Sequence, residues 1–251
     1  MYIGYRQDVP PMSFVDKDNQ PAGYSIDLCS HIVNEVKAEL KDPNIAIKYV
    51  PVTASSRFNA LKDNSIDILC GSTTKTLSRS ALVDFTQLSF VTGASLLSLQ
   101  SAKIGGIPDL EGKKIAVVKG TTTIDSLNNV ITKLDVNTEV VLVDSASEGF
   151  NAVADGKADA FSSDQIVLIG LVLTHQNPEL FSIAEGVYSY EPYALAVRQN
   201  DSEFRLIADR VLSRLNRSGS ITPIFVKWFG GYLKEVPTLL NAMYILNSTP
   251  E

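Results

Sequence analysis

Strand-like and helix-like segments alternate along most of this 251-residue chain, and that regular order restricts the folds open to it. Residues 66–70 and 115–118 are short apolar runs typical of buried strands. Between such runs, apolar residues recur at the three- and four-residue spacing of amphipathic helices, as in the first one: Cys29, Ile32, Val33, Val36 and Leu40. Thr122 and Asp125 have the spacing of a capping box at a later helix start, with Asp in place of the usual Glu or Gln. The alternation predicts an α/β protein with mainly parallel sheets flanked by helices.

Composition excludes several classes of protein. Hydrophobic residues make up 45% of the chain, which is enough for a buried core, and the length allows one large domain or two small ones. The formal net charge is −6 and no long Lys/Arg run is present, so a nucleic-acid partner is not expected. The longest apolar stretch, residues 166–173, is far shorter than the ~20 residues that a membrane-spanning helix needs.

Cysteine and histidine are scarce. Cys29, Cys70, His31 and His175 do not form a set at metal-ligand spacing, so no metal is expected, and no cofactor is indicated. The two cysteines are predicted to be either small buried hydrophobes or one disulfide, which an oxidising compartment would favour. The chain opens with strand-like residues 2–5 and no signal peptide, so we expect either a cytoplasmic protein or a chain that begins after a removed leader.

Polar groups that could bind a ligand follow several predicted strands. Arg6, residues 71–74, residues 120–123 and Asp164 lie just beyond carboxyl ends of strands, which meet at one edge of an open parallel sheet. Arginine can hold a carboxylate by two hydrogen bonds, a helix N-terminus offers amides to an anion, and an aspartate can balance an ammonium group. These residue types predict a binding site for a zwitterion.

Short stretches, taken in order, resemble one known family. They are Gly4-Tyr5-Arg6 with Pro11-Met12-Ser13-Phe14, residues 23–28, residues 51–57, residues 66–74 with Arg79, residues 83–86, residues 110–117, Gly120-Thr121-Thr122, residues 156–160 and residues 193–198. Together they resemble the periplasmic amino-acid-binding proteins of ATP-driven importers, the bacterial extracellular solute-binding proteins of family 3, and specifically the glutamate/aspartate-binding branch. The resemblance covers nearly the whole chain.

The resemblance implies an architecture and a function. It implies a two-lobed clamshell with one lobe from residues 1–92 plus 192–251 and the other from 93–191. The chain would cross between the lobes near residues 90–97 and 187–193, and a hinge motion would close the cleft over the ligand. The implied function is binding of free glutamate or aspartate and its delivery to the membrane permease of an ABC importer, by a monomer in the periplasm after loss of a leader.

The resemblance also implies a role for each matching residue. Arg79, Thr74 and the amides near Thr121, Thr122 and Thr123 would hold the α-carboxylate of the ligand. Asp164, with Ser72 and Thr74, would receive its α-ammonium group. Arg6 and Arg57 would reach the side-chain carboxylate, Thr73 lies within the same turn, and Phe14 would form a wall against the carbon chain.

Departures from the family pattern keep alternatives open. Ala146 stands where the branch usually has a histidine, so one contact to the side-chain carboxylate is missing or moved, and a neutral polar ligand such as glutamine stays an alternative. An enzyme on the same fold, similar to cyclohexadienyl or arogenate dehydratases, is a second alternative, but Glu148, Asp164 and Glu191 have no histidine neighbour in the motifs. A periplasmic address would favour the Cys29–Cys70 disulfide.

Overall fold

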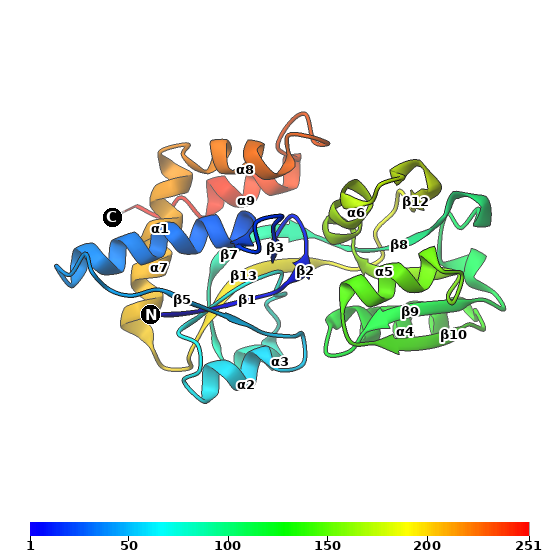
Figure 1. The fold of residues 1–251 in the computed structure, drawn as a ribbon, viewed down its shortest axis with the longest axis horizontal. Helices are drawn as coiled ribbons and strands as arrows, with labels where there is room; N and C mark the ends of the chain where they lie inside the picture. The colour runs from blue at the N-terminus through cyan, green and yellow to red at the C-terminus, as the bar shows by residue number, and fades with distance from the viewer. Residues whose placement is uncertain (251) are drawn as a thin grey trace.

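The computed structural model describes residues 1–250 and contains two five-stranded sheets, each with helices packed against it. The first sheet has the order β5-β1-β6-β13-β7, with β1 Tyr2–Tyr5, β5 Lys48–Pro51, β6 Ile68–Cys70, β7 Asp84–Thr92 and β13 Glu191–Val197. The second has the order β10-β9-β11-β8-β12, with β8 Ala94–Leu99, β9 Lys114–Val118, β10 Glu139–Val143, β11 Ala160–Asp164 and β12 Phe181–Ile183. We call the bodies built around them lobe 1 and lobe 2, and they lie side by side (Figure 1).

Helices flank both sheets. Lobe 1 carries α1 Tyr24–Glu39, α2 Arg57–Lys62, α3 Leu77–Ser80, α7 Ser202–Arg217, α8 Ile221–Phe229 and α9 Thr238–Leu246. Lobe 2 carries α4 Thr122–Leu134, α5 Ala146–Ala154 and α6 Gln165–Thr174. The predicted apolar stripe of the first helix is buried, since Cys29 and Ile32 are fully enclosed. The α/β fold class is therefore confirmed.

Each sheet is mixed rather than mainly parallel. In lobe 1, β5, β1 and β6 are parallel, whereas β13 runs antiparallel to both β6 and β7. In lobe 2, β10, β9 and β11 are parallel, and β8 is antiparallel to β11 and β12. The chain passes from lobe 1 to lobe 2 where β7 leads directly into β8, and it returns in the segment before β13. These connecting strands are among those with antiparallel neighbours.

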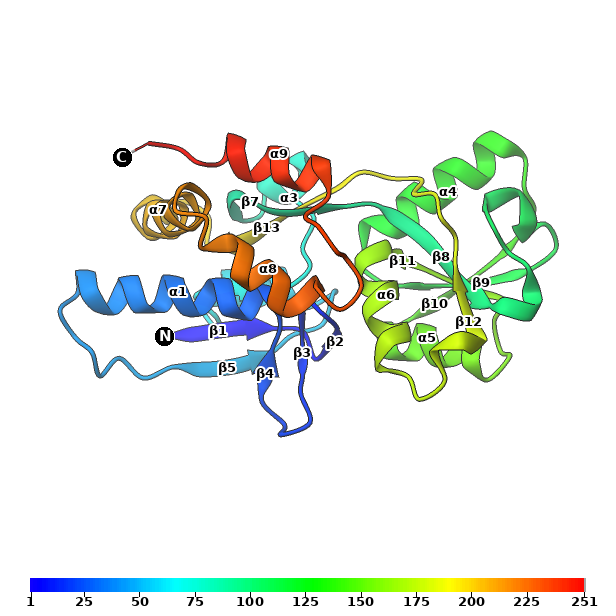
Figure 2. The same cartoon turned by 90° about the horizontal axis from the view of Figure 1, so that it is seen from above.

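The two connections between the lobes run next to each other (Figure 2). Thr92, at the end of β7, is paired with Glu191, at the start of β13. A Cβ atom on Gly93 would lie 2.4 Å from the Ser189 carbonyl oxygen, so only glycine allows this close approach. The crossing point is thus a narrow pair of backbone segments.

A third, small sheet joins lobe 1 to the edge of lobe 2. It contains β2 Asp8–Val9, β3 Ser13–Val15 and β4 Pro21–Ala22 in the order β2-β3-β4. It follows β1 directly, packs on the start of α1, and reaches α5 and α6 of lobe 2 through β2.

One disulfide connects Cys29 of α1 to Cys70 at the end of β6, with 6.3 Å between the Cα atoms. Of the two states that the sequence left open, the structure therefore contains the disulfide. It ties the helix to the strand end that precedes the turn at residues 71–74. Across residues 1–250, no helix combines the length and apolar character needed to span a membrane.

Candidate functional site

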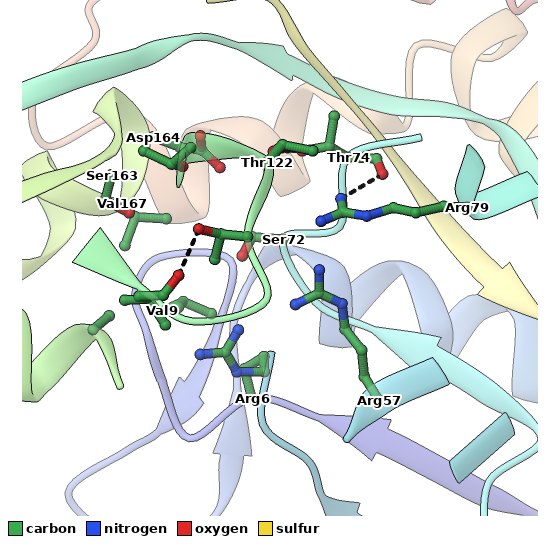
Figure 3. Close-up of a pocket in the computed structure, with 14 residues that line it drawn as sticks. Arg6, Val9, Arg57, Ser72, Thr74, Arg79, Thr122, Ser163, Asp164 and Val167 are labelled. Carbon is green, nitrogen blue, oxygen red and sulfur yellow. Dashed lines mark hydrogen bonds between the residues drawn. The ribbon is translucent and has the colours of Figure 1, made fainter. Parts of the chain in front are cut away.

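A cavity of about 30 Å³ lies between the lobes, at the carboxyl ends of β1, β6, β9 and β11. Its lining is mostly polar and comes from both lobes (Figure 3). The residues that line it are Arg6, Val9, Arg57, Ser72, Thr74, Arg79, Val118, Thr121, Thr122, Thr123, Ala146, Ser163, Asp164 and Val167. The structure thus brings together most of the residues that the sequence analysis selected from distant motifs.

Three arginines converge on this cavity. Arg6 follows β1, Arg57 begins α2 and Arg79 lies in α3, and their guanidinium groups point into the same space (Figure 3). Arg79 donates to the Thr74 carbonyl oxygen at 2.9 Å and to the Gly120 carbonyl oxygen of lobe 2 at 3.3 Å. The cluster concentrates positive charge where the lobes meet.

Arg57 is the least compensated of the three. Its side chain is 2% exposed, it donates to the Gly120 carbonyl oxygen at 3.3 Å, and its Nε is buried without a hydrogen-bond partner. Burial, followed by the positive charges of Arg79 and Arg6, lowers the pKa of the Arg57 guanidinium. A buried cation with one long hydrogen bond and two cationic neighbours favours the binding of an anion.

Arg6 is partly neutralised by Asp8, a residue that the sequence analysis did not select. The Asp8 carboxylate accepts a hydrogen bond from Arg6 at 3.2 Å. Its other oxygen accepts from the backbone amides of Ala146 at 2.5 Å and Ser147 at 3.3 Å, at the N-terminus of α5 in lobe 2. Asp8 therefore bridges the lobes beside the position where the branch usually has a histidine. A carboxylate two residues after a predicted cleft arginine is the signal that could have identified it.

Asp164 lies opposite the arginines, between the end of β11 and the start of α6 (Figure 3). Its Oδ2 accepts a hydrogen bond from the Tyr193 hydroxyl, while its Oδ1 is buried and has no partner. Burial, with a further contribution from the charge of Glu191, raises the pKa of Asp164 to about 7. A buried carboxylate oxygen without a partner is suited to accept a hydrogen bond from a cation.

The start of α4 differs from the sequence prediction. The expected capping box of Thr122 and Asp125 is wrong: the N-cap residue is Thr121, and no side chain caps this helix. The Thr122 hydroxyl instead donates to Glu191 at 2.7 Å, because Glu191 offers a buried carboxylate at the crossing between the lobes. The first amides of α4 thus receive no side-chain cap, and Thr121, Thr122 and Thr123 line the cavity.

Two predicted site residues lie outside the cavity lining. Thr73 is buried in the turn, and its carbonyl oxygen accepts from the Ala194 amide. The expectation that Phe14 forms the cavity wall is not met, since its ring packs edge-on against Trp228 at 5.8 Å between centroids. Small β-branched side chains form the apolar part of the wall instead: Val9, Val118 and Val167.

The cavity combines cationic and anionic groups at separate ends. On the arginine side it can hold two anionic groups, one near Arg79 and the amides of α4 and one near Arg57 and Arg6. On the Asp164 side it can hold one cationic hydrogen-bond donor. The described residues contain no cluster of three or more His, Cys, Asp or Glu side chains placed to hold a metal ion.

Comparisons with known proteins find relatives along most of the chain. Residues 1–231 match the model of the bacterial extracellular solute-binding proteins, family 3. A glutamate/aspartate import solute-binding protein of Salmonella typhimurium is 31% identical over 227 residues, which is 90% of this chain and 75% of the relative. An L-glutamate/L-aspartate-binding protein of Pseudomonas aeruginosa is 31% identical over 228 residues, 90% of this chain and 76% of the relative. Among solved structures, an ancestral arginine-binding protein bound to glutamine has a TM-score of 0.81 at 27% identity, covering 92% of this chain and 97% of that chain.

Proposed function

This chain belongs to the bacterial extracellular solute-binding proteins of family 3 and is thus an amino-acid-binding component of an ABC importer, and we propose that its ligand is free glutamate or aspartate. The observation that carries the proposal is the convergence of Arg6, Arg57 and Arg79 on one cavity. A neutral or cationic amino acid would leave the buried Arg57 charge without an anionic partner. A dicarboxylic amino acid supplies two anions to these cations.

Each part of such a ligand has a place in the cavity. Arg79 and the free amides of α4 receive the α-carboxylate, and Asp164 with Ser72 receives the α-ammonium group. Arg57 and Arg6 receive the side-chain carboxylate. Ala146 adds no cationic or donor side chain there, so these two arginines carry the preference for an acidic ligand over glutamine.

The lobes supply a mechanism for capture and release. We propose that lobe 1 comprises residues 1–92 plus 192–251 and lobe 2 residues 93–191, with the crossings near 90–97 and 187–193 as the hinge. Arg57 and Arg79 both donate to Gly120 across the cleft, and Asp8 accepts from α5 across it. These contacts favour the closed arrangement, in which the ligand is enclosed until a permease opens the lobes.

The proposal involves binding without chemical change. Asp164 and Glu191 already accept hydrogen bonds from hydroxyl groups. Glu148 accepts a hydrogen bond from the Asp144 amide near the start of α5 and does not line the cavity. The relatives compared above carry names of binding proteins. We therefore propose a monomeric, periplasmic binding protein rather than a dehydratase.

Thermal unfolding in the presence of each of the twenty amino acids tests the ligand. L-Glutamate or L-aspartate is expected to raise the unfolding temperature, because a ligand that binds only the folded state at 100 times its Kd adds about 2.7 kcal/mol of stability. Glutamine and asparagine, which have the same shape without the charge, are the matched controls. A clear shift with a neutral or basic amino acid and none with the acidic pair would refute the acidic assignment.

The affinity for L-glutamate is expected to rise with pH. Asp164 binds the ligand's ammonium group as a carboxylate, and in the ligand-free protein its pKa is about 7. Below pH 7 binding must therefore release the Asp164 proton, so the affinity falls by up to about tenfold per pH unit, or about 50-fold between pH 7 and pH 5. Above pH 7 the affinity is level until the ligand's own ammonium group loses its proton.

Isothermal titration calorimetry between pH 5 and pH 8 measures this dependence. Titrations at pH 6 in buffers of different ionisation enthalpy give the number of protons released, which should be close to one. Asp164→Asn is expected to bind weakly at every pH and to release no proton. An affinity that is level from pH 5 to pH 8 in the unaltered protein would contradict this role of Asp164.

A further inference from the structure

Glu191 is a buried carboxylate that the sequence offered only as a carboxyl for the enzyme alternative, and it is not among the residues that line the cavity. It begins β13 at the crossing between the lobes and is 1% exposed. Its Oε2 accepts from the Thr74 hydroxyl of lobe 1 at 2.6 Å and from the Thr122 hydroxyl of lobe 2 at 2.7 Å. Its Oε1 accepts from the Ser189 hydroxyl at 2.8 Å. One side chain thus connects both lobes and the crossing segment.

These hydrogen bonds determine which way the two threonine hydroxyls point their protons. A hydroxyl has one proton and two lone pairs, whereas an ionised carboxylate can only accept. The oxygens of Thr74 and Thr122 are 3.4 Å apart, so the short contact to Glu191 takes the Thr122 proton. Both hydroxyls therefore donate their hydrogen bonds to Glu191. Their lone pairs can accept hydrogen bonds from a ligand in the cavity that they line.

We propose that Glu191 is a positioning residue that makes the site selective for the α-ammonium group, by holding the Thr74 and Thr122 hydroxyls as acceptors when the lobes close. The inference rests on the proposed function, because it assigns the ammonium group of an amino-acid ligand to these hydroxyls and to Asp164. It also changes one sequence-based expectation. Thr74 keeps its expected role at the ammonium group and loses its expected role at the α-carboxylate. Thr122 joins it as an acceptor, and the α-carboxylate is left to Arg79 and the backbone amides of α4.

The electrostatic surroundings support this assignment. Glu191 and Asp164 are near enough for each charge to act on the other, and the charge of Glu191 is one cause of the raised pKa of Asp164. The charge of Glu191 also acts on one cation, Arg79, and on two phenols, Tyr188 and Tyr193. Two carboxylates on one side of the cavity favour a cation there, and a ligand without an ammonium group would leave them uncompensated.

Two substitutions separate the hydrogen-bonding role from a merely structural one. Glu191→Leu removes the acceptor and frees both hydroxyls to rotate, whereas Glu191→Gln keeps one amide oxygen that can accept from both. The matched control is Asp209→Asn, which neutralises a half-buried carboxylate of lobe 1 that accepts from the Gln87 amide away from the cavity. The probes are L-glutamate and glutarate, the same dicarboxylate without the ammonium group.

Calorimetric titration and competition at pH 8 are expected to show that Glu191→Leu loses most of the preference for L-glutamate over glutarate. Glu191→Leu should weaken L-glutamate binding about 30-fold or more and glutarate binding less than about threefold, because two acceptors for the ammonium group are lost. Glu191→Gln should restore most of the L-glutamate affinity, and Asp209→Asn should match the unaltered protein. Equal weakening of both probes by Glu191→Leu, or an unchanged ratio between them, would overturn the inference.

The pH dependence of Glu191→Gln provides a second, independent measurement. Removal of the Glu191 charge lowers the pKa of Asp164, so the midpoint at which L-glutamate affinity falls should move to lower pH, while Asp209→Asn leaves it in place. An unmoved midpoint counts against the inference even if Glu191→Leu does not fold. If the unaltered protein binds a different amino acid and not L-glutamate, the proposed function fails, and the same variants are then measured with that amino acid and its deaminated analogue.

Discussion

Replacement of Arg79 by methionine is expected to weaken L-glutamate binding by about 30-fold to 5000-fold, because the loss of one partner from a buried, hydrogen-bonded charge pair costs about 2–5 kcal/mol. Arg79 is held by the Thr74 carbonyl oxygen and faces the cavity, where it receives the α-carboxylate. Because every amino acid carries this carboxylate, weak binding should extend to glutamine and aspartate alike. Arg79→Lys should restore little, since a lysine ammonium cannot form the paired hydrogen bonds of a guanidinium.

Calorimetric titration with L-glutamate, L-aspartate and L-glutamine checks the Arg79 prediction. Arg210→Met is the matched control, because it removes an exposed arginine on α7, outside the cavity lining. The control should bind with unchanged affinity and unfold at nearly the same temperature. Retained affinity in Arg79→Met would show that the α-carboxylate is held elsewhere.

Replacement of Arg57 by methionine is expected to have two opposite effects. The ligand-free protein should become more stable, by about 1–3 kcal/mol, because a buried charge with an unpartnered Nε and cationic neighbours is removed. The preference for L-glutamate over L-glutamine should fall by about 100-fold, because a buried charge pair with the side-chain carboxylate is lost. Gain of stability together with loss of selectivity is typical of a residue placed for binding rather than for folding.

Urea unfolding of the ligand-free protein and titration with both ligands measure the two effects of Arg57→Met. Arg198→Met is the control, and its effect on the free energy of unfolding should be the opposite. Arg198 donates to the Ile66 carbonyl oxygen and to Asp67, so its charge is paired in the folded state. This control should lose stability and keep its ligand preference. A loss of stability in ligand-free Arg57→Met would contradict the view that the Arg57 charge is uncompensated.

Local patterns in the sequence predict the elements that position the site. The spacing of Cys29 and Ile32 identifies α1, and the apolar run at residues 115–118 identifies β9, because such patterns depend only on nearby residues. Because the ends of parallel strands meet at one edge of a sheet, Arg6 and Asp164 were expected to share a cleft. They do so for a different reason: β1 and β11 belong to different sheets, and the strand ends of both lobes face one cavity. The cavity lining contains both residues.

Contacts between the lobes could not be predicted in the same way. Asp8 meets the amide of Ala146 across 138 positions of sequence, and Thr122 meets Glu191 across 69. The sequence around Thr122 offers Asp125 as a local partner. No nearby residue indicates that the Thr122 hydroxyl donates to a distant carboxylate instead. Phe14 failed as a predicted wall for a related reason, since its ring packs edge-on against Trp228 of α8, which lies far away in the sequence.

The sequence by itself determined the α/β class, the order of the elements and the set of charged and hydroxyl-bearing residues at the strand ends. Periodicity and strand-end chemistry are local properties of the chain, which is why they can be read without coordinates. Only the tertiary structure decided that Arg57 lacks a full set of partners, that Cys29 and Cys70 are bonded, and that Glu191 receives hydrogen bonds from both lobes. Those properties depend on burial and on distances between atoms brought together by the closed lobes, and these exist only after the chain has folded.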